Sequence, residues 1–282
     1  MKNVKKKMMI FVIITTCMMM MSACGERTST TITLVPNFSD AAGAKVTLTN
    51  NSGDKSHVYQ QTAKGTTVDF RKIAPGSYTL TVEGEDIFSF TQNDITVHST
   101  VAGYTANLFK KGPGGGYVFY DKGDDSDGWR YLEAAPASSE FDAQWGVDRI
   151  MDDDENWVWI YFSGTQTAIG TGNANTQIIN ATLRQIGKTG YAAQMCSALN
   201  INGFNDWFLP SLDELNLMYE NLHKKGSGDF GKGTNSFEWL NWSYWSSSCT
   251  GGDASWTYDF YNGSQGEYEK NDTRRVRAIR AF

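Results

Sequence analysis

The sequence predicts an all-β domain followed by a larger domain that mixes α and β elements. Within residues 31–109, segments such as 44–49 and 77–83 alternate apolar and polar side chains with period two, which is typical of half-buried strands. All nine tryptophans lie between Trp129 and Trp256. The glycine-rich segment 112–116 marks this change in composition and is expected to be a linker or a turn. We therefore expect domains at 31–110 and 112–282, each long enough to bury its own core.

The start of the chain has the features of a lipoprotein signal peptide. Four lysines precede an apolar run at 8–21, which is too short to span a bilayer because a spanning helix needs ~20 residues. Ser22 and Ala23 are small residues directly before Cys24, as a lipoprotein signal peptidase requires. We expect cleavage after residue 23, diacylglycerol and palmitate on Cys24, and a flexible tether at 24–30. An ordinary secretory signal with a chance cysteine is the alternative.

This interpretation places the mature chain outside the cytoplasm, anchored by lipid in a bacterial cell envelope. The outer membrane and the cell surface both stay open as destinations. Removing the four signal-peptide lysines takes the net charge from -6 to about -10. Such an acidic chain does not attract nucleic acid or an anionic membrane face by its overall field. We therefore expect no nucleic-acid partner.

The cysteine count predicts one disulfide. Cys17 leaves with the signal peptide and Cys24 carries the lipid, so Cys196 and Cys249 remain in an oxidising compartment. We expect these two residues to be bonded to each other. Two separate buried thiols are the alternative.

The second domain combines strand and helix patterns. Strands are expected at 116–120, at 129–135, around Tyr244, at 256–260 and at 276–281. Helices are expected at 176–186 and 191–199, where apolar residues share one side. A third helix begins at Ser211, where Glu214 completes a capping box, and ends at Gly226.

The first domain resembles a known class of small β modules. Residues 68–80 read VDFRKIAPGSYTL, with strand residues on both sides of a Pro-Gly turn. This pattern is similar to the prealbumin-like sandwiches of surface proteins, such as the carboxypeptidase-regulatory-like and PEGA-type modules. The resemblance implies an all-β sandwich that acts as a spacer or stalk and has no active site.

Four ordered motifs of the second domain resemble one family. They are the cysteine-bearing helix at 192–199, NDWFLPSLDEL at 205–215, YWSSS at 244–248 and VRAIR at 276–280. Their order and spacing over residues 112–282 resemble the Lcl C-terminal domain family, which takes its name from a collagen-like bacterial adhesin. The resemblance implies a C-type-lectin-like α+β fold, related in architecture to the formylglycine-generating enzymes, and an adhesion-type role.

The chain departs from this family pattern at two positions. Many members have a cysteine in the closing strand, where this chain has Ala278. Cys249 is then the partner that remains for Cys196, which implies a rewired disulfide. Phe208 replaces the arginine that commonly follows the tryptophan, so any role of that arginine is lost.

A search for catalytic patterns predicts no enzyme, no catalytic residue and no cofactor. The chain has no Gly-x-Ser-x-Gly elbow, Walker A loop or dinucleotide-binding fingerprint. Only His223 lies in the large domain among the three histidines, which argues against a histidine-based zinc site. Two runs of carboxylates lack the spacing of an EF-hand and are expected to be solvated turns, with calcium binding left open: Asp121, Asp124, Asp125 and Asp127, and Asp152, Asp153, Asp154 and Glu155.

Aromatic and amide side chains between two of the family motifs suggest a ligand-binding surface on the loops at 226–273. Aromatic rings can stack on sugars, and short polar groups can bind the hydroxyls. The candidates are Trp239, Asn241, Trp242, Tyr258, Tyr261, Asn262 and Tyr268. Four other tryptophans sit inside motifs and are expected in the core: Trp129, Trp207, Trp245 and Trp256.

The function that follows is a non-catalytic surface module that binds a glycan or an extracellular protein. The resemblance associates relatives with sulfated glycans, which the charge of the mature chain opposes. A local basic strip could compensate, formed by Lys270, Arg274, Arg275, Arg277 and Arg280. A structural envelope protein that packs against partners is the alternative, and an enzyme of unknown type is the third possibility.

Overall fold

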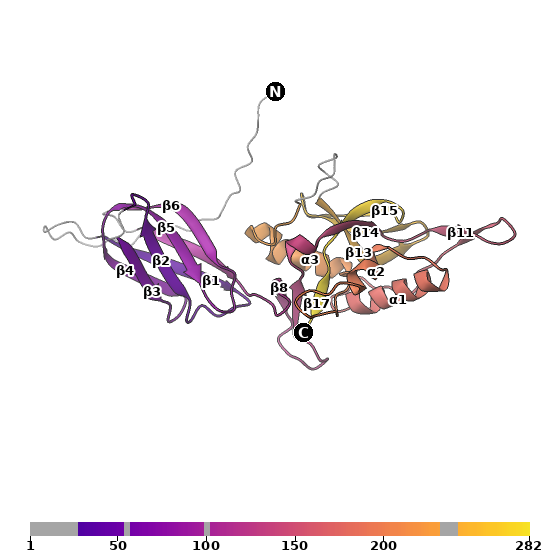
Figure 1. Cartoon of the computed structure of the whole chain (residues 1–282), viewed down its shortest axis with the longest axis horizontal. Helices are drawn as coiled ribbons and strands as arrows, with labels where there is room; N and C mark the ends of the chain where they lie inside the picture. The colour runs from indigo at the N-terminus through magenta and orange to yellow at the C-terminus, as the bar shows by residue number, and fades with distance from the viewer. Residues whose placement is uncertain (1–27, 54–56, 99–101, 232–241) are drawn as a thin grey trace, which may run out of the picture. The chain divides into compact units, whose positions relative to one another are not determined.

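The computed structural model describes residues 28–53, 57–98, 102–231 and 242–282 (Figure 1). The chain divides into two compact units, Met1–Lys111 and Gly112–Phe282. Cys24 and the expected signal peptide at 1–23 lie outside the described residues, and so do Trp239 and Asn241. In the part of the chain that is described, no helix is long and apolar enough to cross a membrane.

The described part of the first unit is built from two β-sheets. Its strands are β1 (Thr28–Asn37), β2 (Lys45–Asn50), β3 (Val58–Thr62), β4 (Thr67–Ile73), β5 (Gly76–Glu83), β6 (Phe90–Val97) and β7 (Ala102–Phe109). One sheet has the order β4-β1-β7 and the other the order β3-β2-β5-β6. β1 pairs with β7 in parallel, whereas the other neighbours are antiparallel.

A single hydrophobic core joins the two sheets. Ile32 of β1 and Phe70 of β4 come from one sheet, and Leu48 of β2 and Leu80 of β5 come from the other. All four side chains are buried in the same cluster, because alternate residues of each strand point to one face. The first unit therefore packs as a sandwich of two sheets, in which the period-two segments of the sequence supply the buried faces.

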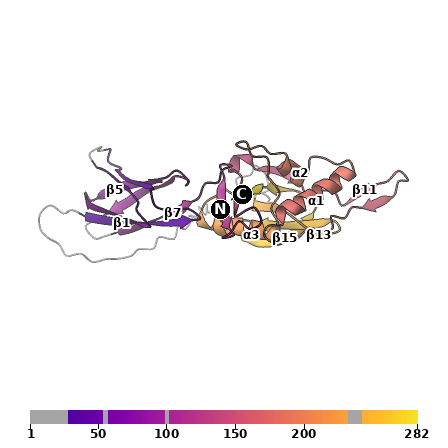
Figure 2. The same cartoon turned by 90° about the horizontal axis from the view of Figure 1, so that it is seen from below.

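The second unit combines three sheets with three α-helices in its described residues. Its strands are β8 (Tyr117–Asp121), β9 (Tyr131–Ala134), β10 (Phe141–Gln144), β11 (Arg149–Met151), β12 (Trp157–Trp159), β13 (Ser243–Gly251), β14 (Ala254–Asp259), β15 (Ser264–Glu269), β16 (Thr273–Val276) and β17 (Ile279–Ala281). The sheet orders are β10-β16-β13-β14-β15, β17-β9-β8 and β11-β12. The helices are α1 (Gly172–Gln185), α2 (Ala192–Ser197) and α3 (Leu212–Asn221). In Figure 2, α1 and α2 lie on one side of the sheet that contains β13 and β15.

The core of the second unit is built around large aromatic side chains. Trp145, Trp207 and Trp245 are buried together with residues of α1 and α2. Each indole N–H has a backbone acceptor: Trp145 donates to the Ser246 carbonyl at 2.6 Å and Trp245 to the Ala143 carbonyl at 3.0 Å. Burial is therefore achieved without an unsatisfied donor. The expected core positions Trp129 and Trp256 are only half-buried.

The third helix begins as the sequence predicts. The Ser211 hydroxyl accepts from the Glu214 N–H at 3.3 Å, and the Glu214 carboxylate accepts from the Ser211 N–H at 2.7 Å. The Glu214 carboxylate also accepts from the Gly170 N–H at 2.8 Å, just before α1. The α-helix ends at Asn221, and a 3-10 turn at His223–Lys225 leads to Gly226, whose φ of 77° only glycine adopts readily.

The glycine segment at 112–116 is a turn that belongs to the second unit. The N–H groups of Gly114 and Gly116 donate to the buried Glu133 carboxylate at 3.1 and 2.7 Å. A Cβ on Gly112 would overlap this carboxylate, and a Cβ on Gly116 would overlap the Ala134 carbonyl. The glycines are therefore needed for close approach of the backbone to β9, not for flexibility.

Candidate functional site

A cluster of aromatic rings lies under the span 226–273, where the sequence predicts ligand-binding loops. Those loops are a wrong prediction for much of the span, because β13, β14 and β15 occupy most of its described residues after 242. Phe260 is fully buried at its centre, with ring centroids 4.6 Å from Phe230 and 4.7 Å from Tyr244. Tyr219 of α3 and His223 contact the same Phe260 ring at 5.7 Å each. The cluster therefore connects α3, the 3-10 turn, β13 and the end of β14 into one packed frame.

Two of the predicted ligand-binding residues form the outer layer of this frame. The Trp242 ring is half-buried and lies 5.5 Å from His223 and 6.2 Å from Tyr261. Tyr261 is 59% exposed. Gly231 lies directly under the Trp242 ring, because a Cβ at this glycine would overlap it. Trp242 and Tyr261 thus present adjacent ring surfaces, which we call the ring pair.

The β14–β15 turn holds this ring pair in place. The Tyr261 N–H donates to the Asp259 carboxylate at 2.7 Å, and the Ser264 N–H donates to the Asn262 side-chain oxygen at 2.9 Å. The Phe260 N–H donates to the Trp242 carbonyl at 2.8 Å. Asn262 therefore orders the turn through its oxygen while standing on the exposed side of the chain.

Two other predicted residues do not join the ring pair. Tyr258 is buried, its hydroxyl donates to the Asn216 side chain at 2.7 Å, and burial raises its pKa to about 12. Tyr268 pairs with Ser255 further along the β14–β15 ladder, and the Arg274 guanidinium lies 4.2 Å from its ring centroid. Among the described candidates, the structure therefore brings together Trp242, Tyr261 and Asn262.

The predicted basic strip is wrong, because its cations are inside the domain. Lys270, Arg274, Arg275, Arg277 and Arg280 are all buried. The Arg277 Nε donates to Glu140 at 2.6 Å, and the rest of its guanidinium donates to the carbonyls of Ala135 and Gly228 at 2.9 Å. Arg275 pairs with both Glu140 and Asp142. These charges hold internal carboxylates and cannot bind a sulfated glycan at the surface.

The remaining cations of that strip are also engaged inside the unit. Arg280 pairs with Asp206 through two hydrogen bonds of 2.8 and 2.9 Å, and its guanidinium lies 4.0 Å from the Phe204 ring centroid. Lys270 donates to the Gly251 and Gly252 carbonyls, with its ammonium 5.1 Å from the Phe162 ring centroid. Asp206 therefore anchors the loop that precedes α3.

The expected disulfide is not formed in the structure. Cys196 and Cys249 are both free thiols. Cys196 packs in the core beside α1, where burial raises the pKa of its thiol. The Cys249 sulfur lies 3.4 Å from the Gly251 N–H and 3.7 Å from the Ala254 carbonyl, at the β13–β14 turn. Each sulfur is thus held by its own surroundings, and Cys196 acts as a small apolar core residue.

The acidic run after β8 is an ion-paired turn. Arg130 binds Asp121 through hydrogen bonds of 2.7 and 2.9 Å, and Lys122 lies 2.9 Å from Asp127. Asp124 accepts from the backbone and hydroxyl of Ser126. No cluster of three His, Cys, Asp or Glu side chains suited to a metal ion is present in the described ranges.

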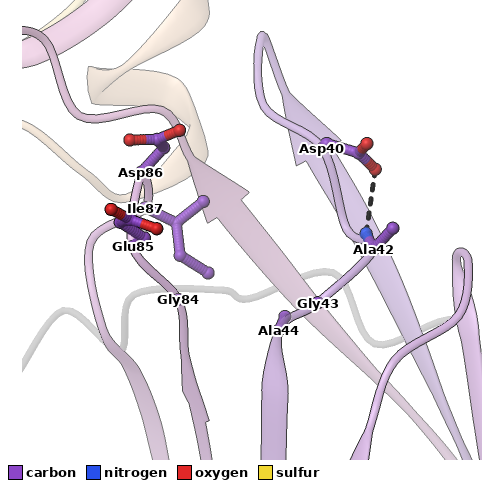
Figure 3. Close-up of a pocket in the computed structure, with 8 residues that line it drawn as sticks. All are labelled: Asp40, Ala42, Gly43, Ala44, Gly84, Glu85, Asp86 and Ile87. Carbon is purple, nitrogen blue, oxygen red and sulfur yellow. Dashed lines mark hydrogen bonds between the residues drawn. The ribbon is translucent and has the colours of Figure 1, made fainter.

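Two open cavities lie in the first unit. One, of about 240 Å³, lies between the loop that contains Asp40 and the loop that contains Glu85 and Asp86 (Figure 3). The Asp40 carboxylate accepts from the Ala42 N–H at 2.8 Å and so serves its own turn. The other, of about 520 Å³, is lined by the turns at 50–52 and 74–77. Neither cavity involves a predicted ligand-binding residue.

The sequence analysis missed an exposed aromatic hairpin in the second unit. β11 and β12 carry Trp157 and Trp159, which are 57% and 45% exposed. The usable signal is the Trp-Val-Trp alternation at 157–159, one residue after the acidic run at 152–155, which is typical of a hairpin strand with two tryptophans on one face.

Comparisons with known proteins give weak structural likenesses and one domain match. A fimbrial protein from Bacteroides ovatus aligns at 12% identity and a TM-score of 0.40, over 91% of this chain and 71% of that protein. A cohesin–X-dockerin complex from Acetivibrio cellulolyticus aligns at 12% identity and a TM-score of 0.24, over 30% of this chain and 58% of that one. A Bacteroides uniformis protein, provisionally described as carbohydrate binding, aligns at 10% identity and a TM-score of 0.26, over 44% and 60%.

These TM-scores are too low to support an inference about function. A search of curated proteins found no match. The family comparison does find one: residues 142–280 match the model of the Lcl C-terminal domain, the family that the four sequence motifs resemble.

Proposed function

We propose that this chain is a non-catalytic surface lipoprotein whose second unit binds a glycan or an extracellular protein. The first unit acts as a prealbumin-like spacer, and the second is a C-type-lectin-like module with an adhesion-type role. Lipid on Cys24 anchors the chain to the cell envelope. The Lcl C-terminal domain match over residues 142–280 supports the adhesion-type role.

The ring pair is the observation that carries this proposal. Trp242 and Tyr261 offer apolar ring faces to solvent, and the amide of Asn262 lies next to them in the same turn. The buried cluster around Phe260 supports the Trp242 ring through His223, so little side-chain entropy is lost when a ligand covers that ring, and Tyr261 packs against Trp242. An apolar platform beside a polar group fits the alternating C–H and hydroxyl faces of a sugar, and also fits a protein side chain.

The test is an array of glycans and matrix proteins probed with the exported chain and its variants. Trp242→Ala and Tyr261→Ala should weaken binding to any array-identified ligand by about 1–3 kcal/mol, as interface aromatic residues do. Tyr161→Ala is the matched control, because Tyr161 is 63% exposed in the same unit and is not among the rings that contact Trp242 or Tyr261 in the described residues. Circular dichroism checks that each variant folds.

Two outcomes would count against the proposed site. If both ring-pair variants bind as well as the unchanged chain, the ligand is held elsewhere. If Tyr161→Ala weakens binding as much as Tyr261→Ala, the effect is a general loss of exposed aromatic surface. Absence of any ligand on the array would favour the structural alternative, in which the second unit packs against envelope partners.

A further inference from the structure

The hairpin β11–β12 is a two-stranded ribbon with its outer edges open. Arg149 pairs with Trp159, Ile150 with Val158 and Met151 with Trp157. Hydrogen bonds from the Ile160 N–H to the Asp148 carbonyl and from the Asp152 N–H to the Asn156 carbonyl extend the ladder at both ends. Within the described residues, β11 and β12 pair only with each other. We call residues 149–159 the aromatic ribbon.

The ribbon extends away from the body of the second unit in both views (Figures 1 and 2). A two-stranded ribbon buries little of its own surface, so its side chains stay in contact with water. Of the nine exposed large hydrophobic side chains in the described residues, the ribbon holds four: Met151, Trp157, Val158 and Trp159. Ordinary surfaces carry single exposed apolar residues that are scattered. Four exposed apolar side chains on one short element therefore mark an interaction surface.

One face of the ribbon is organised for contact. Opposite residues of antiparallel strands point to the same side, so Arg149, Met151, Trp157 and Trp159 share a face. The Arg149 guanidinium carbon lies 4.9 Å from the Trp157 ring centroid and 5.7 Å from that of Trp159. The arginine holds both rings in position and leaves much of their surface open. Val158 extends the apolar surface to the opposite face.

The turn at the end of the ribbon carries a dense negative charge. The Asp152 carboxylate accepts from the N–H groups of Asp154 and Asn156 at 3.0 and 2.8 Å, and Glu155 has a φ of 64°. These bonds fix the turn and keep the side chains of Asp153, Asp154 and Glu155 exposed. The apolar face of the ribbon therefore ends at a turn that carries these three exposed carboxylates.

The combination of charge and apolar surface selects the kind of partner. Inserting this turn into a bilayer would bury or crowd several carboxylates, and an anionic membrane or a sulfated glycan would be repelled by them. A partner that carries cations beside apolar side chains matches both features. Tryptophan, arginine and methionine are also the residues enriched at protein interfaces.

We propose that the aromatic ribbon docks an extended protein segment in which Lys or Arg alternates with apolar residues. The segment adds as a strand to an open edge of the ribbon, as in recognition by β-augmentation. Its apolar side chains contact Trp157 and Trp159 on one face, and those of its cations that reach the end of the ribbon lie near Asp153, Asp154 and Glu155. This surface is separate from the ring pair, so the inference does not depend on the proposed function.

The test uses two ten-residue synthetic peptides, one alternating Lys with Val and one alternating Glu with Val, titrated into the full chain by calorimetry. We expect the Lys-Val peptide to bind and the Glu-Val peptide not to bind. Trp157→Ala/Trp159→Ala should weaken binding by about ten-fold, as loss of hot-spot residues does. The variant Asp153→Asn/Asp154→Asn/Glu155→Gln leaves the rings unchanged and should weaken binding and remove most of its dependence on salt. Val58→Ala is the control, because Val58 is 47% exposed but belongs to the first unit, and this variant should bind like the unchanged chain.

Equal binding of the two peptides would overturn the proposal, and so would full binding by the Trp157→Ala/Trp159→Ala variant with its circular dichroism unchanged. The same variants are tested against neutral chito-oligosaccharides and against zwitterionic lipid vesicles. The Lys-Val peptide could fail to bind while the oligosaccharide or the vesicle binds. If the Trp157→Ala/Trp159→Ala variant loses that binding, the ribbon is a sugar platform or a membrane anchor and not a peptide site. Loss of glycan binding in Trp242→Ala with normal peptide binding separates the two surfaces.

Discussion

Removing the negative charge of Glu140 should destabilise the second unit more than any exposed charge change. The Glu140 side chain is 2% exposed and pairs with Arg275 and with Arg277, which are also buried. Its carboxylate also accepts from the Tyr244 hydroxyl at 2.9 Å. Glu140→Gln keeps the shape of the side chain and removes the charge, so two guanidinium groups lose their buried anion.

The expected magnitude follows from the cost of an uncompensated buried charge. Breaking a buried ion pair by removing one partner costs about 3–5 kcal/mol. With an unfolding slope of about 2 kcal/mol per molar urea for a unit of this size, the midpoint should fall by about 2 M. Tryptophan fluorescence reports this transition selectively, because all nine tryptophans lie in the second unit.

The matched control is Glu220→Gln on α3. Glu220 pairs with Lys224 at 2.8 Å, but both side chains are about half exposed. Solvent screens such a pair, so the control should leave the midpoint almost unchanged. Equal shifts of the urea midpoint for Glu140→Gln and Glu220→Gln would refute the reasoning, because the buried ion pairs of Glu140 would then stabilise the unit no more than an exposed pair.

Two further predictions concern acid titration and anchoring. Burial raises the pKa of Glu214 to about 7, so the folded unit holds a proton there that the unfolded chain loses near pH 4.5; stability should therefore fall as pH rises from about 4.5 to 7. From pH 5 to pH 7, the urea midpoint should fall further for the unchanged chain than for Glu214→Gln. An equal fall for the two proteins would contradict this assignment of the pKa. Cys24→Ala should release the protein from membranes and remove its lipid; acylated, membrane-bound variant protein in mass spectrometry and fractionation would disprove the anchor.

Local signals in the sequence predict local structure in this chain. The start of α3 follows from Ser211 and Glu214 because a capping box involves only four consecutive residues. The two other helices occur near their predicted places, although α1 begins at Gly172 and α2 ends at Ser197. Period-two alternation likewise predicts the strands of the first unit, because a buried face and an exposed face impose that pattern on each strand.

Long-range pairing is the part that the sequence does not reveal. Arg277 and its partner Glu140 are separated by 137 residues, and Arg280 lies 74 residues from Asp206. A run of cations looks the same in the sequence whether each member faces solvent or an internal carboxylate. The basic strip was assigned to the surface for this reason, whereas folding brings an acidic side chain or a backbone carbonyl to each of its members.

The distribution of tryptophans was equally hard to predict. Trp145 and Trp157 lie only twelve positions apart, yet the first is fully buried and the second is 57% exposed. The difference arises because Trp145 packs in the core of the second unit against Phe162, whereas Trp157 lies on β12, which pairs only with β11 in the described residues. The sequence predicts ligand-binding aromatics where polar and aromatic residues lie between two family motifs, a criterion that favours the span after α3 and not the ribbon.

The burial of five cations changes which ligands the second unit can bind. The mature chain already has an expected net charge of about -10, and five of its cations are buried: Lys270, Arg274, Arg275, Arg277 and Arg280. The carboxylates of Asp153, Asp154 and Glu155, in contrast, stand exposed at the end of the aromatic ribbon. Each arginine of this strip is paired with a carboxylate, so the strip offers no positive patch to a ligand, whereas the exposed carboxylates of the ribbon turn act on a partner. A neutral glycan on the ring pair and a basic protein segment on the ribbon are both compatible with that field, whereas a polysulfated ligand would have to approach against it.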